Sequence, residues 1–191
     1  MNFFSVTLNP AIDETVVLES LRPGAVHRAR SVSFHAGGKG VNVASCLADW
    51  DSAPVMATGI LGANNAGVFE TLFAAKGIRD QFVRVAGDTR TNIKLSHDGD
   101  TTDINLPGLE VDGAAIGKVR EVISANAAAR DVVLLAGSVP AGVSETVYAE
   151  LIAALNAVGA LVVLDTSGAP LTAALRAKAL PYCIKPNRAE L

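Results

Sequence analysis

Short apolar runs rich in β-branched residues alternate along this chain with longer segments of helical periodicity. Such alternation is typical of strand–helix–strand crossover units and predicts a mainly parallel sheet with helices on both faces. Half of the 191 residues are apolar, which is enough for one sizeable core. We therefore predict a doubly wound α/β fold. The expected strands cover residues 3–8, 55–61, 81–85, 131–136, 161–165 and 182–185, and the expected helices cover residues 42–49, 67–76, 114–126, 145–158 and 171–179.

Two stretches, at about residues 14–34 and 88–106, depart from this alternation. Both contain extended segments, expected at residues 14–18 and 26–34 in the first stretch and at residues 91–106 in the second, with alternating polar and apolar positions and no crossover helix. In the second stretch, Asp98-Gly99 predicts a type I′ hairpin turn. We expect these stretches to form a small accessory β lid inserted in the main domain. Because such a sheet exposes an apolar face unless something covers it, a homodimer contact through the lid strands is a further expectation.

A glycine-rich turn, Ala-Gly-Gly-Lys-Gly-Val-Asn-Val-Ala at residues 36–44, leads directly into an expected helix. Its three glycines allow a sharp turn and a close approach of a ligand, while Lys39 adds a positive charge and the helix start adds free N–H groups. The run predicts a binding site for a polar, phosphorylated small molecule. It is not a P-loop, because Gly40 stands where that motif has Ser or Thr, and no third glycine completes a dinucleotide fingerprint.

Polar residues also stand where the first strand ends and where the glycine run becomes a helix. Asp13 follows the first strand, at the sheet edge where α/β proteins bind ligands, and could hold a substrate hydroxyl. A turn-capping role after Pro10 is equally consistent with its position. The amide of Asn42 could bind a hydroxyl or cap the helix.

Two later segments carry further candidates. Alternation along a strand places Arg90, Asn92 and Lys94 on one face, where they could meet a phosphate or form an ordinary solvated face. The turn Gly137-Ser138 follows a buried strand and suits either a binding role or a tight turn.

Asn187 and Glu190 are three residues apart after Pro186, which places them on one face of a helical turn. An amide and a carboxylate so placed can hold a hydrated Mg²⁺ ion, or they can act as a capping pair.

Composition excludes several classes of protein. The net charge of −3 gives no sign of a nucleic-acid surface, and no apolar stretch is long enough to span a bilayer. The N-terminal residues lack the pattern of a secretory signal. Cys46 and Cys183 are far apart and in no metal-binding pair, which predicts buried free thiols and a reducing, cytoplasmic location. We expect neither nucleic-acid nor membrane partners.

Taken together, these motifs resemble those of the ribokinase-like PfkB sugar kinases along the whole chain, and most of all the 1-phosphofructokinases and tagatose-6-phosphate kinases. The motifs that carry the resemblance occupy residues 8–13, 37–44, 89–92, 137–140 and 185–191. It implies a sugar phosphate bound by Asp13, Gly37, Gly38, Lys39, Asn42, Arg90 and Asn92, with Ser138 close by. It also implies ATP as a second ligand beside Lys185, Asn187 and Glu190, the last two acting on Mg²⁺ through water.

The chain departs from the family at one important place. Family members continue to a glycine-rich Asp-Thr-x-Gly-x-Gly-Asp segment that supplies the catalytic base and an anion hole. The nearest sequence here, at residues 165–170, lacks the second glycine and the final aspartate. The chain thus resembles an N-terminal portion of a kinase, with the C-terminal part of the fold missing, and we expect no catalytic base and no appreciable kinase activity from it alone.

The leading hypothesis is that the full-length protein converts fructose 1-phosphate to fructose 1,6-bisphosphate with ATP. A tagatose-6-phosphate kinase or a 6-phosphofructokinase is the nearest alternative, because Lys39 and Arg90 select a phosphate but not the carbon that carries it. Two further hypotheses are a non-catalytic sugar-phosphate binding module and an incomplete chain without a function of its own.

Overall fold

The computed structural model describes residues 1–50 and 53–188. Its main element is a parallel sheet with the strand order β11-β10-β9-β1-β4-β5, in which β6 also pairs with β4. The strands of this sheet are β1 (Phe3–Thr7), β4 (Val55–Gly62), β5 (Arg79–Asp80), β6 (Val83–Val85), β9 (Val132–Ala136), β10 (Leu161–Asp165) and β11 (Cys183–Ile184). The predicted α/β architecture with a mainly parallel sheet is confirmed.

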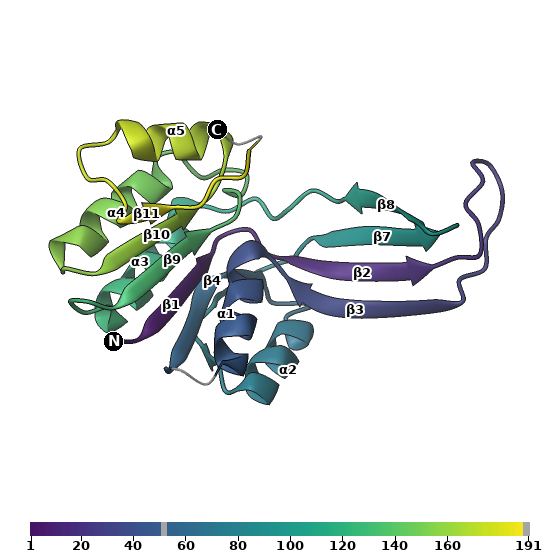
Figure 1. Ribbon diagram of the computed structural model, residues 1–191, viewed down its shortest axis with the longest axis horizontal. Coiled ribbons are helices and arrows are strands. Elements are labelled where there is room, and N and C mark those ends of the chain that lie inside the picture. Colours follow the sequence, from purple (N-terminus) through teal and green to yellow (C-terminus); the bar gives the residue numbers. More distant parts are fainter. Residues whose placement is uncertain (51–52, 189–191) are drawn as a thin grey trace.

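Helices pack on both faces of the main sheet (Figure 1). On one face lie α1 (Lys39–Asp49) and α2 (Gly67–Lys76), which form an apolar cluster around Phe69 and Phe73. On the other face lie α3 (Gly113–Asn126), α4 (Val147–Ala157) and α5 (Gly168–Arg176), packed around Tyr148 and Leu135. Alternate residues of β4 therefore enter two separate cores, with Met56 and Ile60 in one and Val55, Ala57 and Leu61 in the other.

A small sheet projects from the side of the main domain (Figure 1). It contains β2 (Ala11–Val17), β3 (Ser31–Gly37), β7 (Thr91–His97) and β8 (Asp100–Asn105) in the order β3-β2-β7-β8. Asp98 and Gly99 both have positive φ angles, 49° and 79°, as a type I′ turn between β7 and β8 requires. We call this four-stranded element the small sheet.

Several predicted bounds are wrong for local reasons. Helix α1 begins at Lys39 rather than at residue 42, because Gly38 makes the turn with a φ of 120°. Asn42 is not a cap, since its N–H donates to the carbonyl of Gly38 at 2.9 Å inside the helix. The expected strand over residues 81–85 is shorter than predicted and begins only at Val83, because the carboxylate of Asp80 accepts a hydrogen bond from the N–H of Phe82 at 2.9 Å and bends the chain there.

Two more expectations need correction. Residues 26–30 lie outside any strand, and β3 begins only at Ser31. Cys46 and Cys183 are free thiols as predicted, but both are exposed rather than buried. Within the described ranges, no helix has the length and apolar character that crossing a bilayer requires.

The strand order makes the carboxyl end of β1 a topological switch point. From β1 the sheet continues to β4 on one side and to β9 on the other, so the chains that leave β1 and β9 diverge at their carboxyl ends. Such a switch point is where open α/β sheets bind ligands. The small sheet leaves the main domain at this same place, since β2 begins four residues after β1 ends.

Candidate functional site

One face of the small sheet carries a set of polar side chains centred on Asp13. Asp13 in β2 pairs with Asn92 in β7, and the amide of Asn92 donates to Oδ1 of Asp13 at 3.3 Å. Lys94, two residues further along β7, lies on the same face, with its Nζ atom 3.6 Å from Oδ2 of Asp13. Asp13 is therefore a strand residue held by two side chains rather than the cap of a turn.

Arg90 connects this face to the turn after β1. Its Nη1 atom donates to Oδ1 of Asn92 at 3.3 Å, and its Nε and Nη2 atoms donate to the carbonyls of Pro10 at 3.3 Å and Asn9 at 3.4 Å. The guanidinium is thus fixed at the junction of the two sheets. A planar group with several donors in this position suits a phosphate or a carboxylate.

Asn9 extends the network to the end of β9. Its Nδ2 atom donates to the hydroxyl of Ser138 at 3.1 Å, which joins the ends of β1 and β9. The turn that carries Ser138 is held by the carbonyl of Gly137, which accepts hydrogen bonds from Tyr148 at 3.1 Å and from Thr166 at 2.9 Å. Burial raises the pKa of Tyr148, and the charge of Asp165 raises it further, so the hydroxyl keeps its proton as a donor.

The first two glycines of the run at residues 36–44 are required by close contacts. A Cβ atom at Gly37 would stand 2.7 Å from Oδ2 of Asp13. At Gly38 a Cβ atom would lie 3.1 Å from a methyl carbon of Thr7, and the φ of 120° is one that L side chains rarely adopt. These glycines bring the backbone against the Asp13 face of the site.

Lys39 belongs to a second cluster, built around a carboxylate that we did not predict. Its Nζ atom lies 2.9 Å from Oδ1 of Asp165, and Nζ of Lys185 lies 3.6 Å from Oδ2 of the same group. Asp165 is only 6% exposed, at the end of β10. A charged residue at the end of a buried strand is the sequence signal that could have identified it.

Asn42 lies in neither cluster. It lines a hollow of about 600 Å³ between β3, α1 and α2, together with His35 and Lys76. His35 stands opposite Asp13 in the pairing of β2 with β3, so the hollow borders the polar face of the small sheet.

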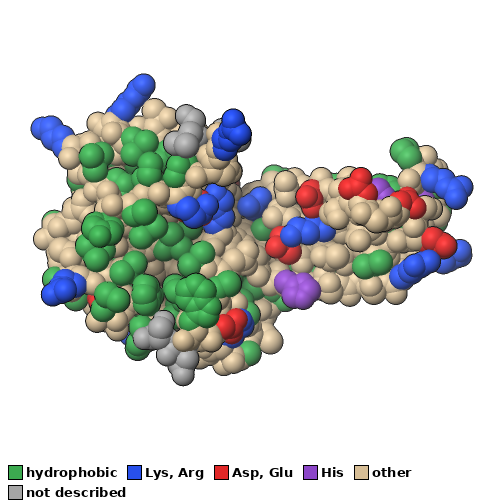
Figure 2. All heavy atoms as spheres, in the orientation of Figure 1, with side chains coloured by type: hydrophobic (Ala, Val, Ile, Leu, Met, Phe, Trp, Pro, Cys, Tyr) green, Lys and Arg blue, Asp and Glu red, His purple; other side chains and the backbone are tan. Residues whose placement is uncertain are grey.

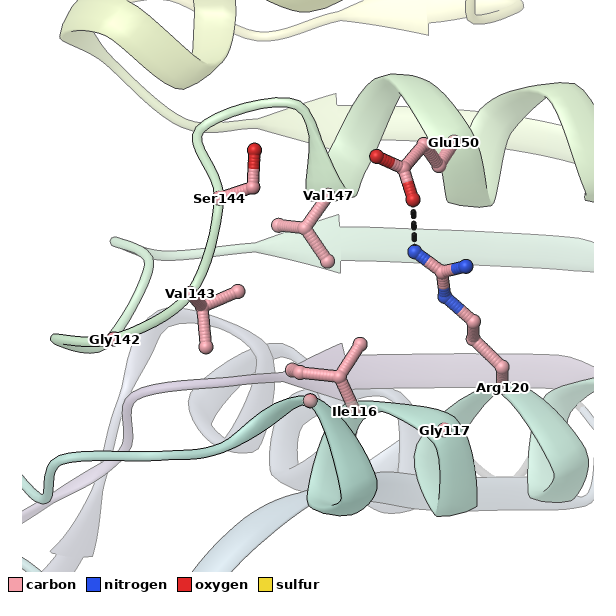
Figure 3. A pocket seen from close by; sticks show the side chains of 9 residues that line it. Ile116, Gly117, Arg120, Gly142, Val143, Ser144, Val147 and Glu150 are labelled. Atoms are coloured by element: carbon pink, nitrogen blue, oxygen red, sulfur yellow. Dashed lines mark hydrogen bonds and ion pairs between the residues drawn. The ribbon is translucent and has the colours of Figure 1, made fainter.

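A separate hollow of about 300 Å³ lies between the first two turns of α3, the loop at residues 142–144 and the first turn of α4 (Figure 3). Arg120 and Glu150 pair across it, and apolar side chains such as Ile116 and Val147 line the rest. The hydroxyl of Thr146, followed by the Arg120 guanidinium, lowers the pKa of Glu150. None of the predicted site residues lines this hollow, so we do not assign the site to it.

The predicted residues thus divide into three groups. Contacts connect Asp13, Gly37, Arg90, Asn92 and Ser138 into one network, with Gly38 beside it, while Lys39 and Lys185 share Asp165 and Asn42 lines the neighbouring hollow. Asn9 and Asp165 are the members that sequence reasoning missed.

The predicted magnesium site cannot be built from the described residues alone. Among residues 1–50 and 53–188, no three His, Cys, Asp or Glu side chains gather where they could hold a metal ion. Asn187 lies two residues beyond Lys185, and Glu190 lies outside the described residues.

With this geometry established, comparison with known proteins identifies the family. The model of the pfkB family carbohydrate kinases matches residues 6–191. The chain belongs to the PfkB family. Among its PfkB relatives, a 1-phosphofructokinase of Xanthomonas campestris pathovar campestris is 57% identical over 98% of the chain, and that of Rhodobacter capsulatus is 44% identical over 98%.

Solved PfkB-type structures share the fold. A Thermotoga maritima protein described as a possible 1-phosphofructokinase superimposes with a TM-score of 0.84 at 27% identity, covering 98% of this chain and 60% of its own. The chain spans 60% of the length of the Xanthomonas relative and 59% of the Rhodobacter relative. It corresponds to the N-terminal portion of these PfkB proteins.

Proposed function

We propose that this chain is the sugar-phosphate-binding portion of a 1-phosphofructokinase, which transfers the γ-phosphate of ATP to the 6-hydroxyl of fructose 1-phosphate. The observation that carries the proposal is the network of Asp13, Asn92 and Arg90, which joins an acceptor, an amide and a guanidinium where the small sheet meets the main sheet. The names of relatives that are 57% and 44% identical support the choice of substrate.

The donor and acceptor groups of each side chain indicate which part of the sugar phosphate it binds. Arg90 is the phosphate-binding group, because its fork of donors is already oriented by Asn9, Pro10 and Asn92. Asp13 and Asn92 bind sugar hydroxyls, since a carboxylate accepts and an amide both donates and accepts. Gly37 and Gly38 let the sugar approach the backbone, and Ser138 closes the main-sheet side of the site.

ATP is the proposed phosphate donor, with Lys39 and Lys185 beside its transferring phosphate. Support comes from their shared contact with the buried Asp165, which holds two cations at the carboxyl end of β10. Asn42 contributes from the adjoining hollow. The assignment of Asn187 and Glu190 to Mg²⁺ through water stays a prediction, because the described residues do not form that site by themselves.

Calorimetric titration of the purified chain tests the sugar assignment. We expect fructose 1-phosphate to bind more tightly than fructose 6-phosphate, tagatose 6-phosphate or fructose. Arg90→Ala should weaken fructose 1-phosphate binding about tenfold or more, which corresponds to roughly 1.4 kcal/mol. Arg176→Ala, an exposed arginine at the end of α5, is the matched control and should leave binding unchanged. Equal affinity for fructose and its phosphate would refute the proposal.

We also propose that two copies of the chain meet through the small sheet. Val32, Phe34 and Ile104 lie on the face opposite Asp13, and Phe34 is 55% exposed there. An apolar sheet face of this kind is typical of an interface. The cytoplasm is the proposed location, since its reducing conditions suit two exposed free thiols.

A further inference from the structure

Gly137, the residue before Ser138, connects the candidate sugar site to the interior of the main domain. Its N–H group donates to the carbonyl of Asp165 at 2.9 Å. Its carbonyl accepts hydrogen bonds from the hydroxyl of Tyr148 at 3.1 Å and from that of Thr166 at 2.9 Å. Both backbone groups of Gly137 are therefore bonded to α4, to the end of β10 or to the residue after it.

The backbone of Gly137 adopts a conformation that determines the direction of the turn. Its φ angle is 95°, in a region that L side chains rarely adopt. Among the described residues, nothing lies within 4 Å of the place where a Cβ atom would stand. The glycine is thus required by the shape of the turn and not by lack of space. This shape sets the direction in which Ser138 leaves the end of β9.

Tyr148 donates its hydrogen bond from the interior of the protein. Its side chain is completely buried in the core that also contains Leu135. Its hydroxyl contacts two consecutive carbonyls, because it also donates to that of Ala136 at 3.3 Å. Burial raises the pKa of Tyr148, so the hydroxyl remains a donor. A phenylalanine would fill nearly the same space without a polar group, so the packing of the ring does not explain the hydroxyl.

Ser138 connects the same turn to the small sheet. Its hydroxyl oxygen accepts a hydrogen bond from Nδ2 of Asn9 at 3.1 Å, and the carbonyl of Asn9 accepts one from Arg90 at 3.4 Å. Because a hydroxyl donates as well as accepts, the proton of Ser138 can bind an oxygen atom of a ligand. In Figure 2, Lys and Arg side chains lie near the junction of the main domain and the small sheet, where their charge favours a phosphorylated ligand.

We propose that Tyr148 and Thr166 are positioning residues, which hold the hydroxyl of Ser138 in place for an oxygen atom of the sugar phosphate. This inference rests on the proposed function. Tyr148 is completely buried and Thr166 is 3% exposed, so both act through the carbonyl of Gly137 rather than by touching the ligand. Without these two donors the turn is less ordered, and ordering it again on binding costs affinity.

Calorimetric titration of variants of the chain with fructose 1-phosphate tests the proposal. Tyr148→Phe should weaken binding about fivefold, the effect of one typical hydrogen bond, and Tyr148→Phe combined with Thr166→Val about twentyfold. Ser138→Ala should also weaken binding. In the Ser138→Ala background, Tyr148→Phe should have no further effect, because the tyrosine acts through Ser138. A merely structural role of Tyr148 would not produce this dependence.

Thr58→Val is the matched control. Thr58 is also completely buried, and its hydroxyl donates to the carbonyl of Gln81 at 2.9 Å, in β4 and away from the turn of Ser138. The variant therefore removes a buried hydroxyl of the same kind without touching the proposed contacts. It should leave the affinity for fructose 1-phosphate unchanged. A loss of affinity equal to that of Tyr148→Phe would overturn the proposal, because reduced stability alone would then explain both.

A second measurement needs no ligand. The N–H of Ser138 and the carbonyl of Gly137 belong to one peptide group, so the amide NMR signal of Ser138 reports on hydrogen bonds to that carbonyl. Tyr148→Phe should shift this signal, and Thr58→Val should leave it in place. An unshifted signal in Tyr148→Phe would overturn the proposal, since the hydroxyl would then have no hold on the turn.

The results distinguish this inference from the proposed function. A wild-type chain that does not bind fructose 1-phosphate refutes the proposed function. A wild-type chain that binds it, together with a Tyr148→Phe variant of the same affinity, refutes the positioning role alone. An effect of Tyr148→Phe that is undiminished in the Ser138→Ala background also refutes the positioning role, because the tyrosine would then act on the ligand by another route.

Discussion

Asp131, at the residue scale, connects three segments of the chain through a buried carboxylate. Its Oδ1 atom accepts a hydrogen bond from the N–H of Asn2 at 2.7 Å, and its Oδ2 atom accepts one from the N–H of Ala128 at 3.1 Å. Burial acts to raise the pKa of Asp131, but the N–H groups of Asn2 and Ala128 oppose it and the net pKa lies below the ordinary 3.8. The charged form therefore stabilises the fold.

We predict that Asp131→Asn lowers the free energy of unfolding at pH 7 by about 2 kcal/mol, because hydrogen bonds to a charged group are lost. A group with a lowered pKa in the folded state contributes above its unfolded pKa and loses that contribution as pH falls through the folded value. The difference between wild type and variant should therefore shrink below about pH 4. Urea denaturation at pH 7 and pH 3 measures it, and an equal difference at both would contradict the explanation.

Some residues of the candidate site could be predicted from the sequence and others could not. Arg90 and Asn92 were recognisable as one face of a strand, and the structure gives them the contact that alternation predicts. The position of Asp165 at the end of a buried strand is visible in the sequence, but its ion pairs are not. Its partners Lys39 and Lys185 are 126 and 20 residues away, and only the parallel pairing of β10 with its neighbours brings them together. Long-range ion pairs of this kind leave no periodic signal in a sequence.

At the scale of elements, the close packing of α1 on β1 depends on Gly40. A Cβ atom at this position would stand 2.3 Å from the hydroxyl oxygen of Thr7 and 2.6 Å from that of Ser5. Both atoms belong to buried residues of a central strand, so they have little room to move.

Gly40→Ala should therefore destabilise the protein by about 1–3 kcal/mol, the usual range for overpacking a close contact. The matched control is Gly117→Ala in α3, where nothing lies within 4 Å of the added carbon. That variant should gain about 0.5–1 kcal/mol from helix propensity. Chemical denaturation monitored by circular dichroism compares the two, and similar midpoints would show that the helix α1 can shift away from β1.

The small sheet supplies a prediction about assembly. Phe34→Asp places a charge on the apolar face, whereas Ser33→Asp places the same charge on the opposite face of the same strand. We expect the wild-type chain and Ser33→Asp to sediment as dimers of the 19.6 kDa chain and Phe34→Asp to sediment as a monomer. A monomeric wild-type chain, or a dimeric Phe34→Asp variant, would exclude this interface.

The bounds of helices and strands could be predicted where a local turn residue determines them. Helix α2 ends at Lys76, as predicted, because Gly77 adopts the left-handed conformation that terminates it. The β7–β8 hairpin was located by Asp98-Gly99 for a similar reason. The start of α1 was predicted too late in the chain. Lys39 and Gly40 follow Gly38 in a glycine-rich run that is typical of a loop, although both residues already belong to the helix.

At the scale of the whole molecule, the site joins two sheets that otherwise pack separately. Asp13, Arg90 and Asn92 come from the small sheet and the turn before β7, whereas Ser138 comes from the main domain and is reached only through Asn9. A sugar phosphate bound between them would connect both parts. Binding and chemistry are nevertheless separable, because phosphoryl transfer also needs groups that stabilise charge on the moving phosphate and accept a proton.

We predict that the chain alone binds fructose 1-phosphate without phosphorylating it at a kinase-like rate. No Asp-Thr-x-Gly-x-Gly-Asp segment occurs in the sequence, and in the described ranges the buried carboxylate nearest to that pattern, Asp165, is neutralised by Lys39 and Lys185. Both oxygen atoms of this carboxylate already face a lysine ammonium, so Asp165 is not placed to take a proton from a sugar hydroxyl. Release of ADP from ATP and fructose 1-phosphate measures the rate, with the full-length Xanthomonas relative as the positive control. Turnover of about 1–100 per second, the usual range for kinases, would show that the chain carries a complete catalytic site.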